Sequence, residues 1–252
     1  KSTGIITKNY PIIKNIDIFL KNNLIKEEKA FYEKEKKLES FENFDMKINN
    51  LNFSYNEKNN IFSKDLDLDL KTGEILFISS ENGKGKTTLT KILAGIIYPT
   101  SGEVSVFGYT PWQRKIPFRQ QMSLVMGQKN QLWWDLPAAD CFLLLKEVYD
   151  IPDKAFNERL DEIATLLEVK NLLSIQVRRL SLGERMKMEL IAALLHQPKV
   201  VFLDEPTIGL DITAQRSVRR FLREYQERYK PMMILTSHYM QDIAELCKRV
   251  VV

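Results

Sequence analysis

The sequence predicts an α/β domain with a mostly parallel sheet, and three observations support this fold class. Short apolar runs such as residues 74–79 and 200–203 lack the alternation of half-buried strands, which is typical of strands buried on both faces. Segments with helical spacing of apolar residues separate these runs, and this alternation favours parallel strands joined by helices. A glycine-bearing loop stands between one apolar run and a helix, a position where backbone N–H groups converge on an anion.

The first part of the chain, residues 1–45, differs from the rest. It contains helix-forming residues with charges of both signs, but its apolar residues are too sparse for a continuous stripe. This pattern predicts a charged, partly helical linker or arm. A globular domain is predicted over residues 46–252.

A small antiparallel β region is predicted at residues 46–70. Within it, residues 65–70 alternate strictly between Asp and Leu, which is typical of a half-buried antiparallel strand. A turn at 71–73 precedes the buried strand at 74–79, and the helix after the glycine-bearing loop covers residues 86–94.

The remaining elements follow from the same patterns. Residues 132–180 are predicted to be mainly helical and to form an inserted helical subdomain. Further strands are expected at 104–107, 123–126, 200–203 and 232–235, and further helices at 136–148, 154–167, 181–196, 213–228 and 239–247.

Composition excludes several classes of protein. Hydrophobic residues make up 44% of the chain, enough for a core, but no apolar stretch is long enough to span a bilayer and no signal peptide is recognised. Cys141 and Cys247 lack metal-ligand spacing, which predicts a reducing compartment. The formal charge of +4 is small, and the Lys and Arg residues are scattered along the sequence, so no nucleic-acid partner is expected. The missing first Met and the apolar end at Val250–Val252 suggest a fragment of a longer chain.

Arginine is distributed unevenly. The first 113 residues contain none, and all 12 Arg lie from Arg114 onward. One hypothesis is that the chain joins segments of two origins near residues 100–114; chance and a preference for surface Lys are the alternative.

The loop at residues 80–87 nearly fits the phosphate-binding pattern G-x-x-x-x-G-K-[ST], with Ser80 in place of the first Gly. Gly83 and Gly85 let the backbone approach phosphate oxygens, Lys86 suits the β- and γ-phosphates, and Thr87 suits Mg²⁺. The nucleotide-binding residues predicted in this loop are Asn82, Gly83, Lys84, Gly85, Lys86, Thr87 and Thr88. The alternative is a strand-to-helix turn that binds nothing.

Two carboxylates, Asp204 and Glu205, follow the apolar run at residues 200–203. Ligands of open α/β sheets lie beyond the carboxyl ends of the strands. Asp204 is therefore expected to hold Mg²⁺, and Glu205 to act as general base toward a water aimed at the γ-phosphate. The alternative is an acidic strand end closed by a turn at Pro206.

These residues together resemble the ATPase domain of ATP-binding cassette (ABC) transporters. The phosphate loop, Leu180-Ser-Leu-Gly-Glu184, Asp204-Glu205 and His238 have the order and spacing of that family, over about residues 46–252. The resemblance implies a P-loop NTPase fold of the ABC type and hydrolysis of ATP with Mg²⁺. It also implies two copies bound head to tail around two ATP molecules, a transmembrane domain as partner, and a cytoplasmic location at the inner face of the cell membrane.

The resemblance implies further residue roles. Tyr55 corresponds to the aromatic residue that stacks on adenine, with a core tyrosine as the alternative. Gln128 corresponds to the glutamine that touches Mg²⁺ and the attacking water, with Gln131 as a rival. His238 corresponds to the histidine that contacts the γ-phosphate, and Asp211 to a loop that crosses to the opposite subunit.

The segment at residues 180–184 departs from the commoner Leu-Ser-Gly-Gly-Gln of the family. Ser181 and Gly183 keep the groups that would bind the γ-phosphate of ATP held by the other copy. Glu184 replaces an amide with a carboxylate that phosphate would repel. Ser181-x-x-Glu184 is also a capping box, so we expect Ser181 to serve ATP and Glu184 mainly to cap a helix.

The loop containing Trp133 and Trp134 lies in the region where the family meets its membrane domain, and it resembles the ATPase subunits of ABC-2-type exporters. The earlier part resembles exporters whose membrane and ATPase domains share one chain. Two other functions stay open: a non-transport ABC ATPase, and a nucleotide-binding module with little catalytic activity. Tandem cassettes or a long coiled-coil insertion would mark the first, and the sequence has neither.

Overall fold

The structure is a computed structural model that describes residues 45–56, 59–60, 66–79, 85–247 and 249–251. The charged arm predicted at residues 1–45 lies outside this part except for Asp45. The strands are β1 (Asp45–Asn52), β2 (Ser54–Asn56), β3 (Asn59–Asn60), β4 (Leu66–Lys71), β5 (Ile75–Ile78), β6 (Ser101–Val106), β7 (Met122–Met126), β8 (Val200–Asp204), β9 (Met232–Thr236) and β10 (Arg249–Val251). The α-helices are α3 (Lys86–Leu93), α4 (Ile116–Gln121), α5 (Ala138–Val148), α6 (Asp153–Leu166), α7 (Leu182–Leu194), α8 (Ile212–Tyr229) and α9 (Met240–Leu246).

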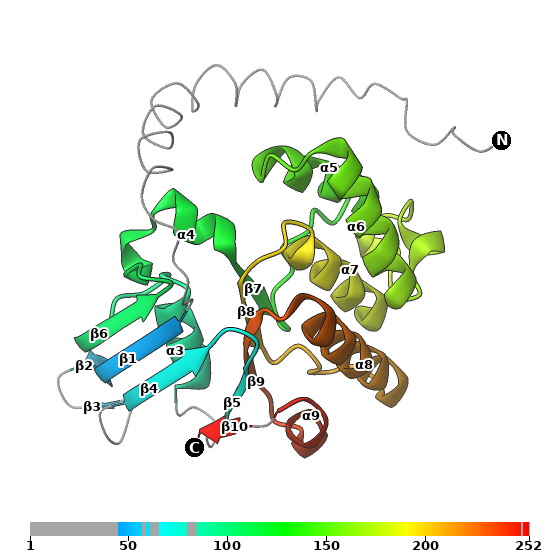
Figure 1. The fold of residues 1–252 in the computed structure, drawn as a ribbon. Helices are drawn as coiled ribbons and strands as arrows, with labels where there is room; N and C mark the ends of the chain where they lie inside the picture. Colours follow the sequence, from blue (N-terminus) through cyan, green and yellow to red (C-terminus); the bar gives the residue numbers. More distant parts are fainter. Residues whose placement is uncertain (1–44, 57–58, 61–65, 80–84, 248, 252) are drawn as a thin grey trace. The chain divides into compact units, whose positions relative to one another are not determined.

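A five-stranded parallel sheet with the order β10-β5-β9-β8-β7 forms the centre of the domain. The central strands β5, β9 and β8 are buried on both faces. In β8, Val200 and Phe202 belong to the core that contains α3, whereas Val201 and Leu203 belong to the core that contains α7 and α8. Figure 1 shows α3 on one side of this sheet and α7 and α8 on the other. Burial on both sides explains why these strands appear in the sequence as continuous apolar runs.

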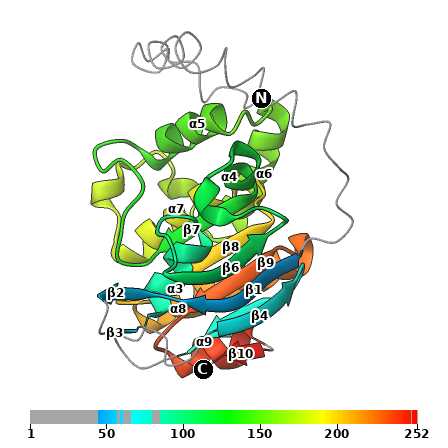
Figure 2. The ribbon, with the colours of Figure 1, turned by 90° about the vertical axis from the view of Figure 1, so that its left-hand side faces the viewer.

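A separate three-stranded antiparallel sheet has the order β4-β1-β6. Figure 2 shows these strands side by side, in front of the parallel sheet. In β4, Leu68 and Leu70 are buried whereas Asp67 and Asp69 are exposed, which confirms the predicted half-buried strand. β6 belongs to this sheet and not to the parallel one, because its partner along the whole strand is β1. The predicted α/β fold with a parallel sheet and a small antiparallel region is confirmed.

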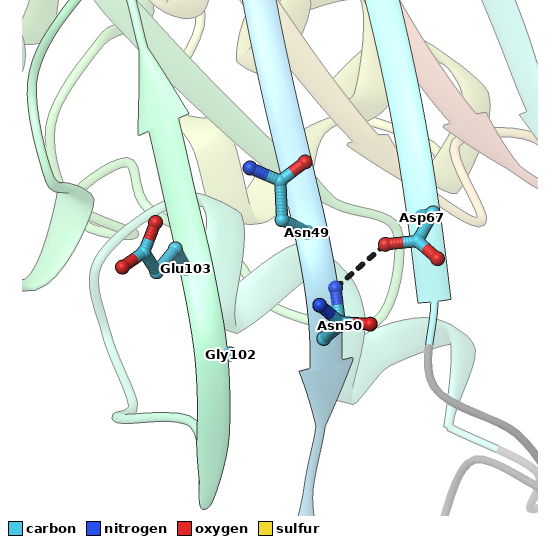
Figure 3. Close-up of a pocket in the computed structure, with 5 residues that line it drawn as sticks. All are labelled: Asn49, Asn50, Asp67, Gly102 and Glu103. Atoms are coloured by element: carbon cyan, nitrogen blue, oxygen red, sulfur yellow. Dashed lines mark hydrogen bonds between the residues drawn. The ribbon is translucent and has the colours of Figure 1, made fainter.

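A bulge interrupts β1 between Ile48 and Leu51, where Asn50 adopts a left-handed φ of 49°. Around the bulge lies an open hollow of about 720 Å³, shown in Figure 3. Asp67 stabilises the bulge, because its Oδ1 accepts a hydrogen bond of 2.7 Å from the backbone N–H of Asn50. Figure 3 shows that Glu103 lies on the far side of β1 from Asp67.

Residues 132–180 contain the helices α5 and α6 together with the short 3₁₀ helices η2 (Lys170–Leu172) and η3 (Val177–Arg179). The observed helices lie within two residues of the predicted ends, α9 and α8 included. Two short elements were not predicted, the 3₁₀ helix η1 (Pro111–Gln113) and α4. Proline stands in the first turn of each, where it is tolerated because the N–H it lacks has no helical partner. Among the described residues, no helix is both long and apolar enough to cross a membrane.

Candidate active site

Most of the predicted site residues follow four neighbouring strands of the parallel sheet, β5, β9, β8 and β7. Asp204 at the end of β8 is in register with Thr236 at the end of β9 and with Met126 at the end of β7, and Thr236 is in register with Ile78 at the end of β5. Because parallel strands end at one edge of the sheet, the loops after β5, β7, β8 and β9 all begin there. This edge is the candidate active site.

The phosphate loop is described only from Gly85 onward, so Asn82, Gly83 and Lys84 lie outside the described residues and their roles stay predictions. Gly85 has a φ of +90°, a left-handed conformation that glycine adopts without steric cost. Helix α3 begins at the next residue, Lys86, and Lys86 and Thr88 are buried. The N–H groups at the start of a helix attract anions, so this terminus suits a phosphate group.

Thr87 in the first turn of α3 contacts the end of β8. Its Oγ1 donates a hydrogen bond of 3.1 Å to Oδ1 of Asp204. The same Oδ1 accepts a bond of 2.7 Å from Oγ1 of Thr236, the last residue of β9. A buried carboxylate beside a hydroxyl is an oxygen donor set of the kind that Mg²⁺ prefers. The described residues contain no cluster of three or more His, Cys, Asp or Glu, so a metal bound here would take further oxygens from its ligand or from water.

Glu205 and His238 form a pair next to this carboxylate. Nε2 of His238 lies 3.1 Å from Oε1 of Glu205, and the backbone N–H of His238 donates a bond of 3.1 Å to Oε2. Glu205 has a left-handed φ of 54°, which is strained for a residue with a side chain. Its backbone N–H donates to the carbonyl of Thr236 at 3.0 Å, and this bond fixes the strained turn.

The surroundings of Glu205 suit a general base. Burial raises the pKa of the Glu205 carboxyl above its usual value, while the nearby charges of His238 and Lys86 and the His238 N–H partly oppose this shift. The carboxylate of Asp204 adds a smaller contribution that raises the pKa further. A base with a raised pKa holds a proton more tightly and is better matched to neutral pH.

The loop after β7 approaches the same turn. The N–H of Gly127 donates a bond of 2.8 Å to the carbonyl of Asp204, and a Cβ at Gly127 would lie only 2.0 Å from the carbonyl oxygen of Glu205. Gln128, the next residue, is exposed. The rival Gln131 is engaged elsewhere, because its side-chain amide donates to the carbonyl of Leu124 at 2.6 Å. The role of Gln128 stays a prediction.

Four other predicted residues, Ser181, Gly183, Glu184 and Asp211, gather at a different place. They line an open cleft of about 560 Å³ between the first turns of α7 and α8, and the described residues around this cleft include neither Lys86 nor Glu205. Gly183 is required by packing, since a Cβ there would lie 2.8 Å from Cβ of Ala214 on α8.

Side chains cap both helices at this cleft. Oγ of Ser181 accepts a bond of 3.3 Å from the N–H of Glu184, and Oε2 of Glu184 accepts a bond of 2.8 Å from the N–H of Ser181, which is the predicted capping box at the start of α7. Oε2 of Glu184 also accepts a bond of 2.8 Å from Oγ of Ser181. The bond from the Ser181 N–H lowers the pKa of the Glu184 carboxyl. Asp211 is the N-cap residue of α8, and its Oδ1 accepts a bond of 2.8 Å from the N–H of Ala214. The capping role of Asp211 was not predicted, although an Asp before a helix is a signal for it.

Tyr55 lies in β2, and the role of its ring stays a prediction. Sequence reasoning missed Thr236 and Asp242, whose side chains contact the loops of the site. Asp242 is fully buried and accepts hydrogen bonds from Thr207 and Ser237. Only Thr236 carried a weak signal in the sequence, a hydroxyl at the end of an apolar run.

Comparisons with known proteins show the family of the chain. The family model described as "ABC transporter" matches residues 63–208, more than half of the chain, and this range includes the residues 100–114 where two origins were hypothesised. The chain is 27% identical to the ABC transporter ATP-binding protein NatA of Bacillus subtilis, over 75% of this chain and 76% of NatA. It is 32% identical to the probable multidrug ABC transporter ATP-binding protein YbhF of Escherichia coli, over 72% of this chain but only 31% of YbhF.

Solved structures share the fold. One is cbiO1 from Clostridium perfringens, part of the ABC transporter complex cbiONQ, with a TM-score of 0.73 at 24% identity over 83% of this chain and 84% of that one. Another is the dimer of the ATP-binding cassette MJ0796 bound to ADP and Pi, with a TM-score of 0.70 at 22% identity over 82% of this chain and 93% of that one. Sheet topology, site geometry and family match thus agree, and the chain belongs to the ABC transporter family as one of its ATP-binding ATPase subunits.

Proposed function

We propose that the edge of the parallel sheet binds Mg-ATP and hydrolyses it with Glu205 as the general base. The observation that carries this proposal is the buried Glu205 carboxyl, held beside His238 and next to the Thr87–Asp204 contact. In the proposed reaction Glu205 takes a proton from a water molecule as the water oxygen bonds to the γ-phosphorus. The bond between the γ-phosphorus and the β–γ bridging oxygen breaks, and ADP and phosphate leave.

The other residues position the phosphates and the water. Lys86, at the start of α3, binds the β- and γ-phosphate oxygens, and the helix terminus adds backbone N–H groups. His238 contacts the γ-phosphate, and Gln128 orients the attacking water. Thr87 and Asp204 would hold Mg²⁺, which neutralises charge on the phosphates when bound. Tyr55, Asn82, Gly83, Lys84, Gly85 and Thr88 complete the proposed nucleotide site.

A second copy of the chain completes the site in this proposal. Ser181, Gly183 and Asp211 line a cleft that is separate from Glu205 and Lys86. In the family these positions contact the ATP that the opposite copy holds, and a separate cleft suits that role. Glu184 stays within its own chain, because its carboxylate is engaged by Ser181. The MJ0796 structure, which has the same fold, is dimeric and supports the pairing of two copies.

The variant Glu205→Gln tests this proposal. Without the base, ATP is expected to bind but not to be cleaved, so Mg-ATP should shift the variant to a dimer in size-exclusion chromatography, with phosphate release reduced to background. Lys86→Ala is the matched control that cannot hold ATP and should stay monomeric. Phosphate release by Glu205→Gln at the rate of the original chain would exclude Glu205 as the base. Absence of release by the original chain would favour the binding module without catalysis.

We also propose that the loop of Trp133 and Trp134 contacts a transmembrane partner, which would place the chain at the inner face of the cell membrane and serve export. The two indoles are 49% and 47% exposed. Glu189 on α7 fixes the start of the loop, because its Oε1 accepts hydrogen bonds from the N–H groups of Gln131 and Leu132 at 2.8 and 3.2 Å. Large exposed aromatics on a fixed loop are typical of interface anchors.

Cell fractionation tests this contact. The chain in its parent cell should sediment with membranes, and a Trp133→Ser, Trp134→Ser double variant should move to the supernatant while its isolated phosphate release stays unchanged. Equal sedimentation of both would contradict the contact. The hypothesis of two origins near residues 100–114 finds no support in the family match, and the sequence of the parent gene tests it.

A further inference from the structure

A buried carboxylate behind the catalytic loops has no role in the proposed chemistry. Asp242 lies in the first turn of α9 and is 0% exposed. Its Oδ2 accepts hydrogen bonds of 2.5 Å from Oγ1 of Thr207 and 2.5 Å from Oγ of Ser237. Its Oδ1 accepts a bond of 2.9 Å from the guanidinium of Arg219 on α8. One side chain therefore joins α8, the loop of Thr207 and the loop of Ser237.

Two of these segments carry the catalytic pair. Thr207 stands two residues after Glu205, in the loop between β8 and α8. Ser237 immediately precedes His238, in the loop between β9 and α9, and its Oγ also accepts a bond of 3.0 Å from the N–H of Tyr239. Asp242 thus contacts each loop at a residue that lies only one or two positions along the chain from Glu205 or His238.

Arg219 makes this arrangement rigid. Its side chain is 0% exposed, and it supplies the opposite charge that a buried carboxylate requires. Its other donors face α9 as well, with Nε 3.2 Å from Oε1 of Glu245 and a guanidinium nitrogen 3.4 Å from Oε1 of Gln241. The carboxylate is therefore held to α8 by a contact that does not involve either hydroxyl.

We propose that Asp242 is a positioning residue for catalysis, which rests on the proposed function of Glu205 and His238. Through Thr207 and Ser237 it holds the two loops at the separation where Nε2 of His238 lies 3.1 Å from Oε1 of Glu205. The strained φ of Glu205 needs such support, because a left-handed residue relaxes when its surroundings do not hold it. Loss of either hydroxyl loosens one loop and misaligns base and histidine.

The test removes the hydroxyls and leaves the buried Arg219–Asp242 pair intact. Thr207→Val and Ser237→Ala each remove one bond to Oδ2, and Thr207→Ser and Ser237→Thr keep a hydroxyl for rescue. Thr165→Val is the matched control, because it removes the hydroxyl bond from Thr165 to the carbonyl of Asp161 on α6. The readouts are kcat and KM for phosphate release with Mg-ATP, binding of a fluorescent ATP analogue, and the urea midpoint of each variant.

Thr207→Val and Ser237→Ala are expected to lower kcat by about 10-fold or more, since small misplacements of reacting groups cost rate steeply. KM and analogue binding should stay within about twofold, because the phosphate loop is untouched. Rescue of kcat by Thr207→Ser and Ser237→Thr would separate positioning from a general loss of stability. An unchanged kcat in Thr207→Val and Ser237→Ala would overturn the proposal for Asp242. So would a loss of kcat in Thr207→Ser and Ser237→Thr as large as in the variants that lack the hydroxyl. Absence of hydrolysis by the original chain would instead overturn the proposed function.

Discussion

His196 should make the stability of this domain depend on pH, and the structure gives the size of the effect. Its ring follows the end of α7, stacks on Tyr149 with ring centroids 3.9 Å apart, and places Nε2 3.2 Å from the carbonyl oxygen of Met122. Burial lowers the pKa of His196 to about 4, and the charge of Arg159 contributes in the same direction. The folded protein therefore favours the neutral ring.

The sign of the effect follows from proton binding. Well above pH 6.5 the ring is neutral in both the folded and the unfolded protein, so it does not change the free energy of unfolding with pH. As the pH falls below 6.5 the unfolded chain takes up a proton that the folded chain resists, so stability is lost until the pH reaches about 4. From these two pKa values the loss at pH 5 is about 2 kcal/mol, an upper limit because the ring is only partly shielded from water. A loss of this size lowers Tm by roughly 4–8 °C in a domain of this length.

Urea unfolding at pH 7.5 and pH 5 measures this effect. Other groups titrate as well, so the informative quantity is the change in unfolding free energy between the two pH values, compared between the original chain and each variant. His196→Phe keeps a ring to stack on Tyr149, and His196→Gln keeps a donor for the Met122 carbonyl. Both should lose stability on acidification by about 2 kcal/mol less than the original chain. An equal loss in all three proteins would refute the argument that His196 is buried in its neutral form.

Three further predictions follow from single contacts. Glu189→Gln keeps an oxygen that can accept hydrogen bonds from both loop N–H groups, so its free energy of unfolding in urea should stay within about 1 kcal/mol of the original value. Glu189→Leu removes this acceptor and should lower the free energy of unfolding by about 2–4 kcal/mol. Equal losses in the two variants would contradict this reasoning. Gly127→Ala places a Cβ against the backbone carbonyl of Glu205 and should displace the turn that carries the base, which is expected to lower kcat for phosphate release by about 10-fold or more. Normal turnover would contradict the close contact between Gly127 and Glu205. Thr87→Ala should raise the Mg²⁺ concentration needed for half-maximal hydrolysis and Thr87→Ser should not, and an identical Mg²⁺ dependence would exclude Thr87 as a metal ligand.

Much of the fold could be predicted because its patterns are local. Apolar runs such as residues 200–203 identify strands buried on both faces, and the alternation at residues 65–70 identifies a half-buried one. The capping box of Ser181 and Glu184 is also local, since its bonds join residues only three apart. Helix α4 was missed because a helix of 6 residues with a proline in its first turn shows too little periodicity.

The candidate site divides in the same way. The sequence by itself determined that Lys86, Asp204, Glu205 and His238 each follow an apolar run. Because parallel strands end at one edge of a sheet, this placed them at a common edge. It did not separate Gln128 from Gln131. In the structure the Gln131 amide donates to the carbonyl of Leu124, and the role of Gln128 stays a prediction.

Only the tertiary structure showed that Asp242 joins the loops of the catalytic pair. In the sequence this residue resembles any acidic residue in the first turn of a helix, where charge suits the helix dipole. Its burial depends on Arg219, Thr207 and Ser237, of which Arg219 and Thr207 lie 23 and 35 residues away. The type of a residue and its neighbours in sequence fix local structure, but the partner of a buried polar group is set by which segments the fold brings together.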